Sequence, residues 1–87
     1  MQHEEITPEQ CRAGRALIDW TQERLAEAAG VGLSTCKDLE SGKRTPRRIS
    51  MRALRKALED AGVEFLGDGA QSEGGGPGVR LQPQTRK

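Results

Sequence analysis

Apolar residues recur every three or four positions in four successive segments of this 87-residue chain, the spacing of a helix with one buried face. The segments cover residues 8–18, 22–29, 33–41 and about 47–61. Two short stretches further on, 63–66 and 78–81, show the alternation of β-strands. The pattern therefore predicts an all-α fold: a compact four-helix domain over residues 1–62, followed by a short β-strand or hairpin extension over 63–87.

The first helix has a strong start signal. Thr7 can cap the helix, Pro8 suits the first helical position, and Gln10 completes a capping box. Ile6 can then pack onto Cys11 as a hydrophobic staple. The residues expected on the inner side of this helix are Cys11, Gly14, Leu17 and Ile18.

Residues 21–42 are predicted to form two short helices joined by a tight turn. Thr21 can cap the first of them, and Gly30 can adopt the left-handed backbone that ends it. Cys36 and Leu39 should point inward from the second helix. Its polar residues Ser34, Lys37, Asp38 and Ser41 fall at i, i+3, i+4 and i+7 and share the opposite face. Such a face, with short hydrogen-bonding groups and one cation, suits base edges in the DNA major groove.

This segment resembles the helix-turn-helix of the phage repressor and Cro family, also called the XRE family, with agreement from about Thr7 to Phe65. The matching residues are Gln22, Leu25, Ala26, Gly30, Val31, Leu39, Glu40, Gly42 and Pro46. The resemblance implies a repressor-type domain: a sequence-specific transcriptional regulator, a repressor, acting as a homodimer on a palindromic operator. The chain departs from the family at Gly32, where a Ser or Thr cap is usual, and at Cys36, where Ile or Val is usual.

The resemblance also implies roles for single residues. Positions that match base-reading positions of the family are Leu33, Ser34, Lys37 and Asp38. Gln22 matches a position that hydrogen-bonds a DNA phosphate, and Thr35 is expected to support binding on the phosphate side. Arg15 and Glu40 match a pair that holds the first helix against the motif, although two independent surface charges would give the same sequence.

The net charge of +1 hides a strong asymmetry along the chain. Residues 41–58 contain no acidic side chain and seven basic ones: Lys43, Arg44, Arg47, Arg48, Arg52, Arg55 and Lys56. This block follows directly after the helix over 33–41, where a clamp on DNA phosphates is expected. We expect Lys43, Arg44, Arg47 and Arg48 to bind phosphate. The alternative is a solvated helix face, above all for the last three residues of the block.

The fourth helix is expected to begin with Thr45 as its cap and Pro46 as its first residue. Its inward positions are Met51, Leu54, Leu58 and Ala61, and Gly62 ends it. After it, strands 63–66 and 79–81 are expected to pair with each other or with a second subunit. The dimer interface predicted there consists of Val63, Phe65, Leu66, Val79 and Leu81. A disordered tail beyond Leu66 is the alternative, because a lone hairpin is marginal in water.

Composition excludes several classes of function. The two cysteines, Cys11 and Cys36, fall on predicted core faces, so we expect reduced, structural thiols. There is no metal-ligand spacing, nucleophile–base pair or phosphate-cradling loop, so we expect no enzyme, cofactor or metal. No apolar run reaches membrane-spanning length and the first ten residues lack signal-peptide character, which favours a cytoplasmic protein.

A second class of function stays open at this stage. The chain could be an antitoxin or antiactivator, whose main task is to bind a protein partner and whose DNA binding is secondary. The glycine-rich C-terminal segment favours this reading, because a disordered segment can fold on a partner.

Overall fold

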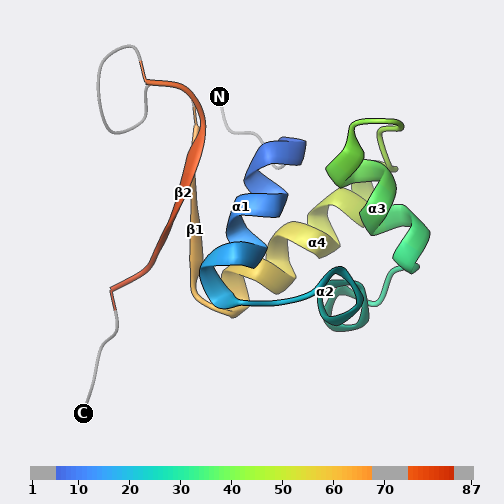
Figure 1. The fold of residues 1–87 in the computed structure, drawn as a ribbon, viewed down its shortest axis with the longest axis horizontal. Coiled ribbons are helices and arrows are strands. Elements are labelled where there is room, and N and C mark those ends of the chain that lie inside the picture. The colour runs from blue at the N-terminus through green and yellow to red at the C-terminus, as the bar shows by residue number, and fades with distance from the viewer. Residues whose placement is uncertain (1–5, 68–74, 84–87) are drawn as a thin grey trace.

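The computed structural model of the chain describes residues 6–67 and 75–83 (Figure 1). In chain order the elements are α1 (Pro8–Ile18), α2 (Gln22–Ala29), α3 (Leu33–Ser41), α4 (Arg48–Asp60), β1 (Val63–Leu66) and β2 (Gly78–Leu81). Within these residues, four helices and one two-stranded antiparallel hairpin make up the fold, so the predicted fold class is confirmed.

The capping residues fix the ends of the first two helices. The Thr7 hydroxyl accepts a hydrogen bond from the Gln10 amide, and the Gln10 side chain accepts one from the Thr7 amide, so the capping box is complete. Thr21 caps α2 through the amide of Arg24. Gly30 ends α2 with φ 73°, a left-handed conformation that glycine adopts without strain.

The core is aliphatic and draws on every helix and on the first strand. Its fully buried side chains are Leu25, Leu54, Leu58, Val63, Cys11 and Cys36. A Cβ atom at Gly14 would lie 3.4 Å from Val63 Cγ1, which shows how closely α1 approaches β1. Val63 belongs to the same core as the helices, so the hairpin packs against the helical domain.

The two strands pair within the chain, with Val63 opposite Leu81 and Phe65 opposite Val79. They pack along α1, and β1 also contacts α4 (Figure 1). The Gln10 side-chain amide reaches across from α1 and donates to the carbonyls of Leu66 and Gly78, at 3.1 and 2.9 Å. One buried side chain therefore caps α1 and clamps the hairpin.

Two expectations about single residues are wrong. The fourth helix does not begin at Thr45 and Pro46: both precede the helix, and Arg47, with extended backbone at φ −60° and ψ 153°, occupies the cap position before Arg48. Leu17 is not an inner residue of α1, because its side chain is 40% exposed. The inner stripe follows Cys11, Gly14 and Ile18, and Leu17 lies to one side of it.

Candidate nucleic-acid interface

Residues 21–42 form a helix, a tight turn and a second helix, as the sequence predicts. The turn is closed by main-chain hydrogen bonds, with Gly30 N donating to the Glu27 carbonyl at 3.2 Å and Val31 N to that of Ala26 at 3.0 Å. The α3 helix starts at Gly32 with no side-chain cap hydrogen bond, as the glycine there predicts. Gly42 ends α3 with φ 75°.

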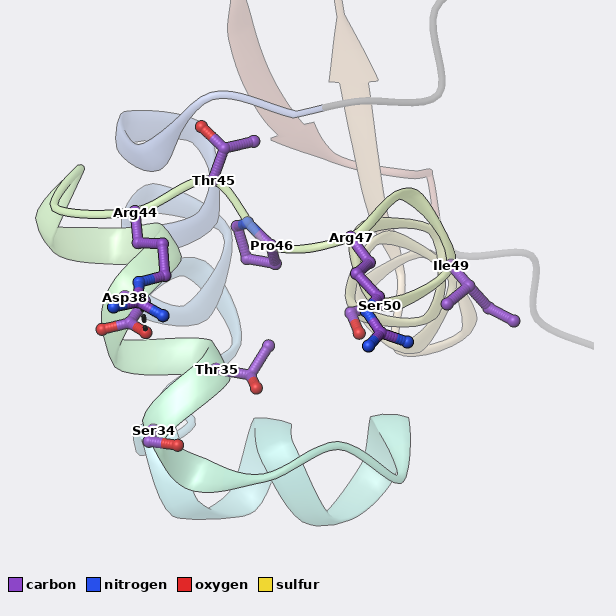
Figure 2. Close-up of a pocket in the computed structure, with 9 residues that line it drawn as sticks. All are labelled: Ser34, Thr35, Asp38, Arg44, Thr45, Pro46, Arg47, Ile49 and Ser50. Carbon is purple, nitrogen blue, oxygen red and sulfur yellow. Dashed lines mark ion pairs between the residues drawn. The ribbon is translucent and has the colours of Figure 1, made fainter.

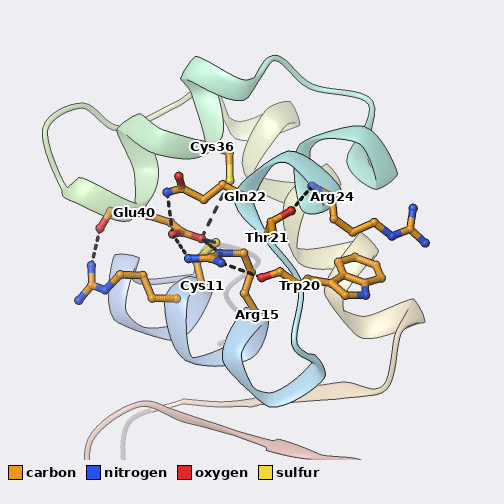
Figure 3. A network of polar contacts seen from close by, with 9 residues as sticks. Cys11, Arg15, Trp20, Thr21, Gln22, Arg24, Cys36 and Glu40 are labelled. Carbon is orange, nitrogen blue, oxygen red and sulfur yellow. Dashed lines mark hydrogen bonds and ion pairs between the residues drawn. The ribbon is translucent and has the colours of Figure 1, made fainter.

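A buried carboxylate holds α3 in place. The Glu40 side chain on α3 is 2% exposed, and Arg15 on α1 donates to both of its oxygens, from Nε at 2.6 Å and from Nη2 at 2.8 Å (Figure 3). Gln22 on α2 donates to the same carboxylate at 3.0 Å. The Glu40 main-chain carbonyl accepts a further hydrogen bond from Arg12. Three helices thus meet on one residue, and the predicted Arg15–Glu40 pair is present.

Charge and burial act against each other at this carboxylate. Burial works to raise the pKa of Glu40, and hydrogen bonds from Arg15, Cys11 and Gln22 overcome that effect, so its pKa lies below the usual range. The hydrogen bonds to Glu40 also raise the pKa of Arg15. The pair is therefore ionised at neutral pH.

The two cysteines lie in the same cluster. The Cys11 thiol donates to Glu40 Oε2 at 3.2 Å, and the Cys36 sulfur lies 4.0 Å from that oxygen (Figure 3). Both are free and fully buried. The hydrogen bond with Cys36, burial and the nearby carboxylate raise the pKa of the Cys11 thiol. Among the described residues, no group of three or more His, Cys, Asp or Glu side chains could hold a metal ion.

The outer face of α3 presents the polar residues that the spacing predicts. Ser34, Lys37 and Ser41 are exposed, and Asp38 and Leu33 are half-buried. Asp38 lies 4.0 Å from Arg44 Nε, a loose ion pair across the loop that follows α3. The pair places a cation beside the Asp38 carboxylate on this face of α3.

A groove of about 470 Å³ runs between α3 and the start of α4 (Figure 2). Its wall from α3 consists of Ser34, Thr35 and Asp38; the other wall, from the connecting loop and α4, consists of Arg44, Thr45, Pro46, Arg47, Ile49 and Ser50. Two guanidinium groups and several hydroxyls therefore surround one open groove beside the face of α3. Such a lining suits a chain of phosphates.

Some predicted contact residues lie apart from this groove. The residues that line it do not include Leu33, Lys37, Lys43 or Arg48. Lys43 and Arg48 are exposed and are the sequence neighbours of the lining residues Arg44 and Arg47. Gln22 is half-buried and its side-chain amide donates to Glu40. A phosphate bound at the start of α2 would therefore contact the main-chain amides of the helix N-terminus rather than the Gln22 side chain. At the end of α4, Arg55 and Lys56 pair with Glu59 and Asp60 one turn on.

Four groove residues are not among the contacts predicted from the sequence: Thr45 and Pro46, expected at the start of the fourth helix, and Ile49 and Ser50. Ile49 is 70% exposed and Ser50 lies beside it at the start of α4. A signal for Ile49 was present, because it is out of phase with the inward stripe of Met51, Leu54 and Leu58. Nothing comparable marks Ser50, whose place in the groove depends on how the loop crosses from α3.

The helix-turn-helix family model matches residues 12–61, which contain the turn, α3 and its buried anchor Glu40. The chain belongs to the XRE-type helix-turn-helix family. No curated protein sequence matches it. As a member of that family it is a DNA-binding transcriptional regulator. In the described part of the chain no helix has the length and apolar character needed to cross a bilayer.

Proposed function

We propose that this helix-turn-helix protein is a sequence-specific repressor that binds double-stranded DNA as a cytoplasmic homodimer on a palindromic operator. The observation that carries the proposal is the exposed polar face of α3 beside a groove lined by Arg44 and Arg47. A face that can read base edges and a flank that can hold phosphates lie next to each other, which is the division of work in DNA recognition.

In this proposal the α3 helix lies in the major groove. Lys37 donates to guanine O6 and N7, Ser34 hydrogen-bonds a base or a phosphate, and Leu33 contacts a thymine methyl group. Asp38 accepts from cytosine N4 or orients Lys37. These four residues are the proposed base-reading set.

Phosphate contacts position the domain without reading sequence. We assign them to the exposed side chains of Lys43, Arg44, Arg47 and Arg48, with Thr35 supporting from the groove wall. The N-terminus of α2 at Gln22 supplies a further contact, because main-chain amides and the helix dipole favour an anion there. Two copies of the domain would occupy two half-sites on one face of the duplex, and occupation of a promoter would block transcription.

The test is fluorescence anisotropy of the protein on DNA from its own promoter region against scrambled DNA of the same length, at two salt concentrations. The proposal expects tighter binding to the promoter DNA and a steep fall in affinity with salt. A promoter–reporter assay then determines the sign of regulation. Weak and equal binding to both DNAs would overturn the proposal.

A further inference from the structure

The outer strand of the hairpin has a free edge whose main-chain groups can be assigned. Gln82 N donates to the Gly62 carbonyl at 2.8 Å, and hydrogen-bonded pairs alternate along an antiparallel ladder. Glu64 with Arg80 and Leu66 with Gly78 are therefore the bonded pairs. The main-chain N–H and C=O groups of residues 79 and 81 point away from β1, and no hydrogen bond from any described residue reaches them.

Proline bounds this edge at both ends. The next positions with outward main-chain groups are Pro77 and Pro83, which are exposed and have no N–H. The outward donors between them are only those of Val79 and Leu81. The edge is therefore symmetric about Arg80, with one donor on each side and one proline beyond each donor.

This symmetry selects one register for a second copy of the strand. If a two-fold axis passes Arg80, Val79 of each copy lies opposite Leu81 of the other, and all four outward N–H groups find a carbonyl. An axis at Val79 would place Leu81 opposite Pro77, and an axis at Leu81 would place Val79 opposite Pro83. In either alternative only the residue on the axis forms a complete two-bond pair, because the other outward N–H donates to the carbonyl of a proline that has no N–H to donate back.

Exposed apolar side chains occur on this strand and on the helix that packs against the hairpin. Leu81 is 47% exposed and shares the packed face of the hairpin with its register partner Val63. Val63 lies against Gly14 on α1, and Leu17, 40% exposed, follows Gly14 by three residues along that helix. Leu17 and Leu81 are two of the three large hydrophobic side chains that are exposed among the described residues; the third, Ile49, lines the groove beside α3.

We infer that the partner in the proposed homodimer docks on this edge, so that two β2 strands pair antiparallel about an axis at Arg80 and form a four-stranded sheet. The inference rests on the proposed function, which requires a second copy. On the solvent face the two Arg80 side chains would be neighbours. Each is already neutralised by Glu64, which accepts from Arg80 Nε at 3.1 Å and from Nη2 at 3.2 Å.

The geometry also bears on the operator. The hairpin and α3 lie on opposite sides of the domain, with α1 and α4 between them (Figure 1). A dimer joined at β2 would therefore carry its two recognition helices at its far ends. Half-sites in the operator would be widely spaced, at a whole number of helical turns because both helices must meet the same face of the duplex.

A cysteine cross-link tests the register directly. In an antiparallel sheet, residues of a non-bonded pair have Cα atoms about 4.5 Å apart, within reach of a disulfide. Arg80→Cys should give a covalent dimer on mild oxidation with oxidised glutathione, two thiols losing two electrons and two protons to the oxidant. Glu64→Cys is the matched control: it breaks the same ion pair on the same face but lies one strand further from the axis, and should stay uncross-linked.

The second test uses the free protein without covalent chemistry. Leu81→Pro removes the outward N–H and leaves the bonds of the hairpin itself intact, whereas Leu81→Ala trims the side chain and keeps the N–H. Sedimentation equilibrium should show a dimer for the unchanged protein. The dissociation constant of the dimer should rise by about tenfold or more for Leu81→Pro, because both copies lose a hydrogen bond, and by less for Leu81→Ala.

DNA binding is measured separately, so that the two proposals fail independently. A monomeric unchanged protein, with no cross-link at position 80, would overturn the edge-pairing inference and identify the prolines as protection against pairing. Sequence-specific binding by such a monomer would leave the DNA-binding regulator standing and remove only the homodimer from the proposed function. A dimer that is unaffected by Leu81→Pro would also overturn the inference, since the interface would then lie elsewhere.

Discussion

Arg15 on α1 and Glu40 on α3 form a two-point ion pair that is buried at its acidic end, with the carboxylate 2% exposed and the arginine 20% exposed. The pair joins the first helix of the domain to α3 across 25 residues of sequence. Hydrogen bonds from Gln22 and Cys11 complete the shell of the carboxylate. The orientation of α3 therefore depends on groups that need not touch DNA.

Replacement of Arg15 should destabilise the domain strongly. Arg15→Ala leaves a buried carboxylate without its cation, and we expect a loss of about 3 kcal/mol in the free energy of unfolding. Urea denaturation followed by circular dichroism measures this. Lys56→Ala is the control, because its pair with Asp60 is exposed and should contribute less than about 1 kcal/mol. Equal effects of the two substitutions would contradict the anchoring role of Glu40.

Stability should fall in acid because of the same carboxylate. The folded state lowers the pKa of Glu40 below its unfolded value, so the stabilisation is complete above about pH 4.5 and is lost as the pH falls through the folded pKa. Thermal unfolding at several pH values between 7 and 3 measures how steeply stability depends on pH. The Glu40→Gln variant has no carboxylate to titrate at this position, so its stability should depend less steeply on pH in this range. An unchanged acid slope in that variant would assign the effect to other carboxylates.

The Gln10 side chain should couple the first helix to the hairpin. Gln10→Glu keeps an acceptor for the Thr7 amide but replaces the donor that faces the Leu66 and Gly78 carbonyls. We expect the free energy of unfolding to fall by about 1–3 kcal/mol. Hydrogen exchange should show faster exchange at hairpin amides than at those of α2. Uniform acceleration over all elements would indicate a loss of global stability without a specific clamp.

Lys37 separates base reading from general attraction to DNA. Lys37→Ala should weaken the free energy of binding to the operator by about 1–3 kcal/mol and relax the preference for one base at one position. Anisotropy titrations on operator variants with single base changes measure both effects. Equal losses on operator and on random DNA would remove Lys37 from the base-reading set.

Arg47 should behave in the opposite way, because it lines the groove beside α3 as a phosphate ligand. Arg47→Ala should weaken binding to every DNA sequence and reduce the slope of log K against log salt by about one. Lys56→Ala, whose charge is paired with Asp60 on the same helix, serves as the control. If the salt slope of the Arg47 variant matches that of the unchanged protein, Arg47 is solvated surface.

The sequence alone determined the elements whose causes are local. The Thr7–Gln10 capping box, the Thr21 cap and the left-handed Gly30 act over a few residues, so their patterns predicted the bounds of α1 and α2. The polar face of α3 followed in the same way from helical spacing. The Arg15–Glu40 pair was predictable only through the family resemblance, because nothing local links residues so far apart in the chain.

The tertiary structure decided what depends on contacts between distant segments. Gln10 binds the Gly78 carbonyl 68 residues away, and neither residue signals the other in sequence. Arg47 is extended, α4 begins only at Arg48, and Ile49 lies at the groove, against the simple cap pattern at Thr45 and Pro46. Local hydrogen bonds and the spacing of apolar residues specify where helices form. Which face of each helix becomes buried depends on the elements that pack against it, and these come from distant parts of the chain that meet only in the tertiary structure.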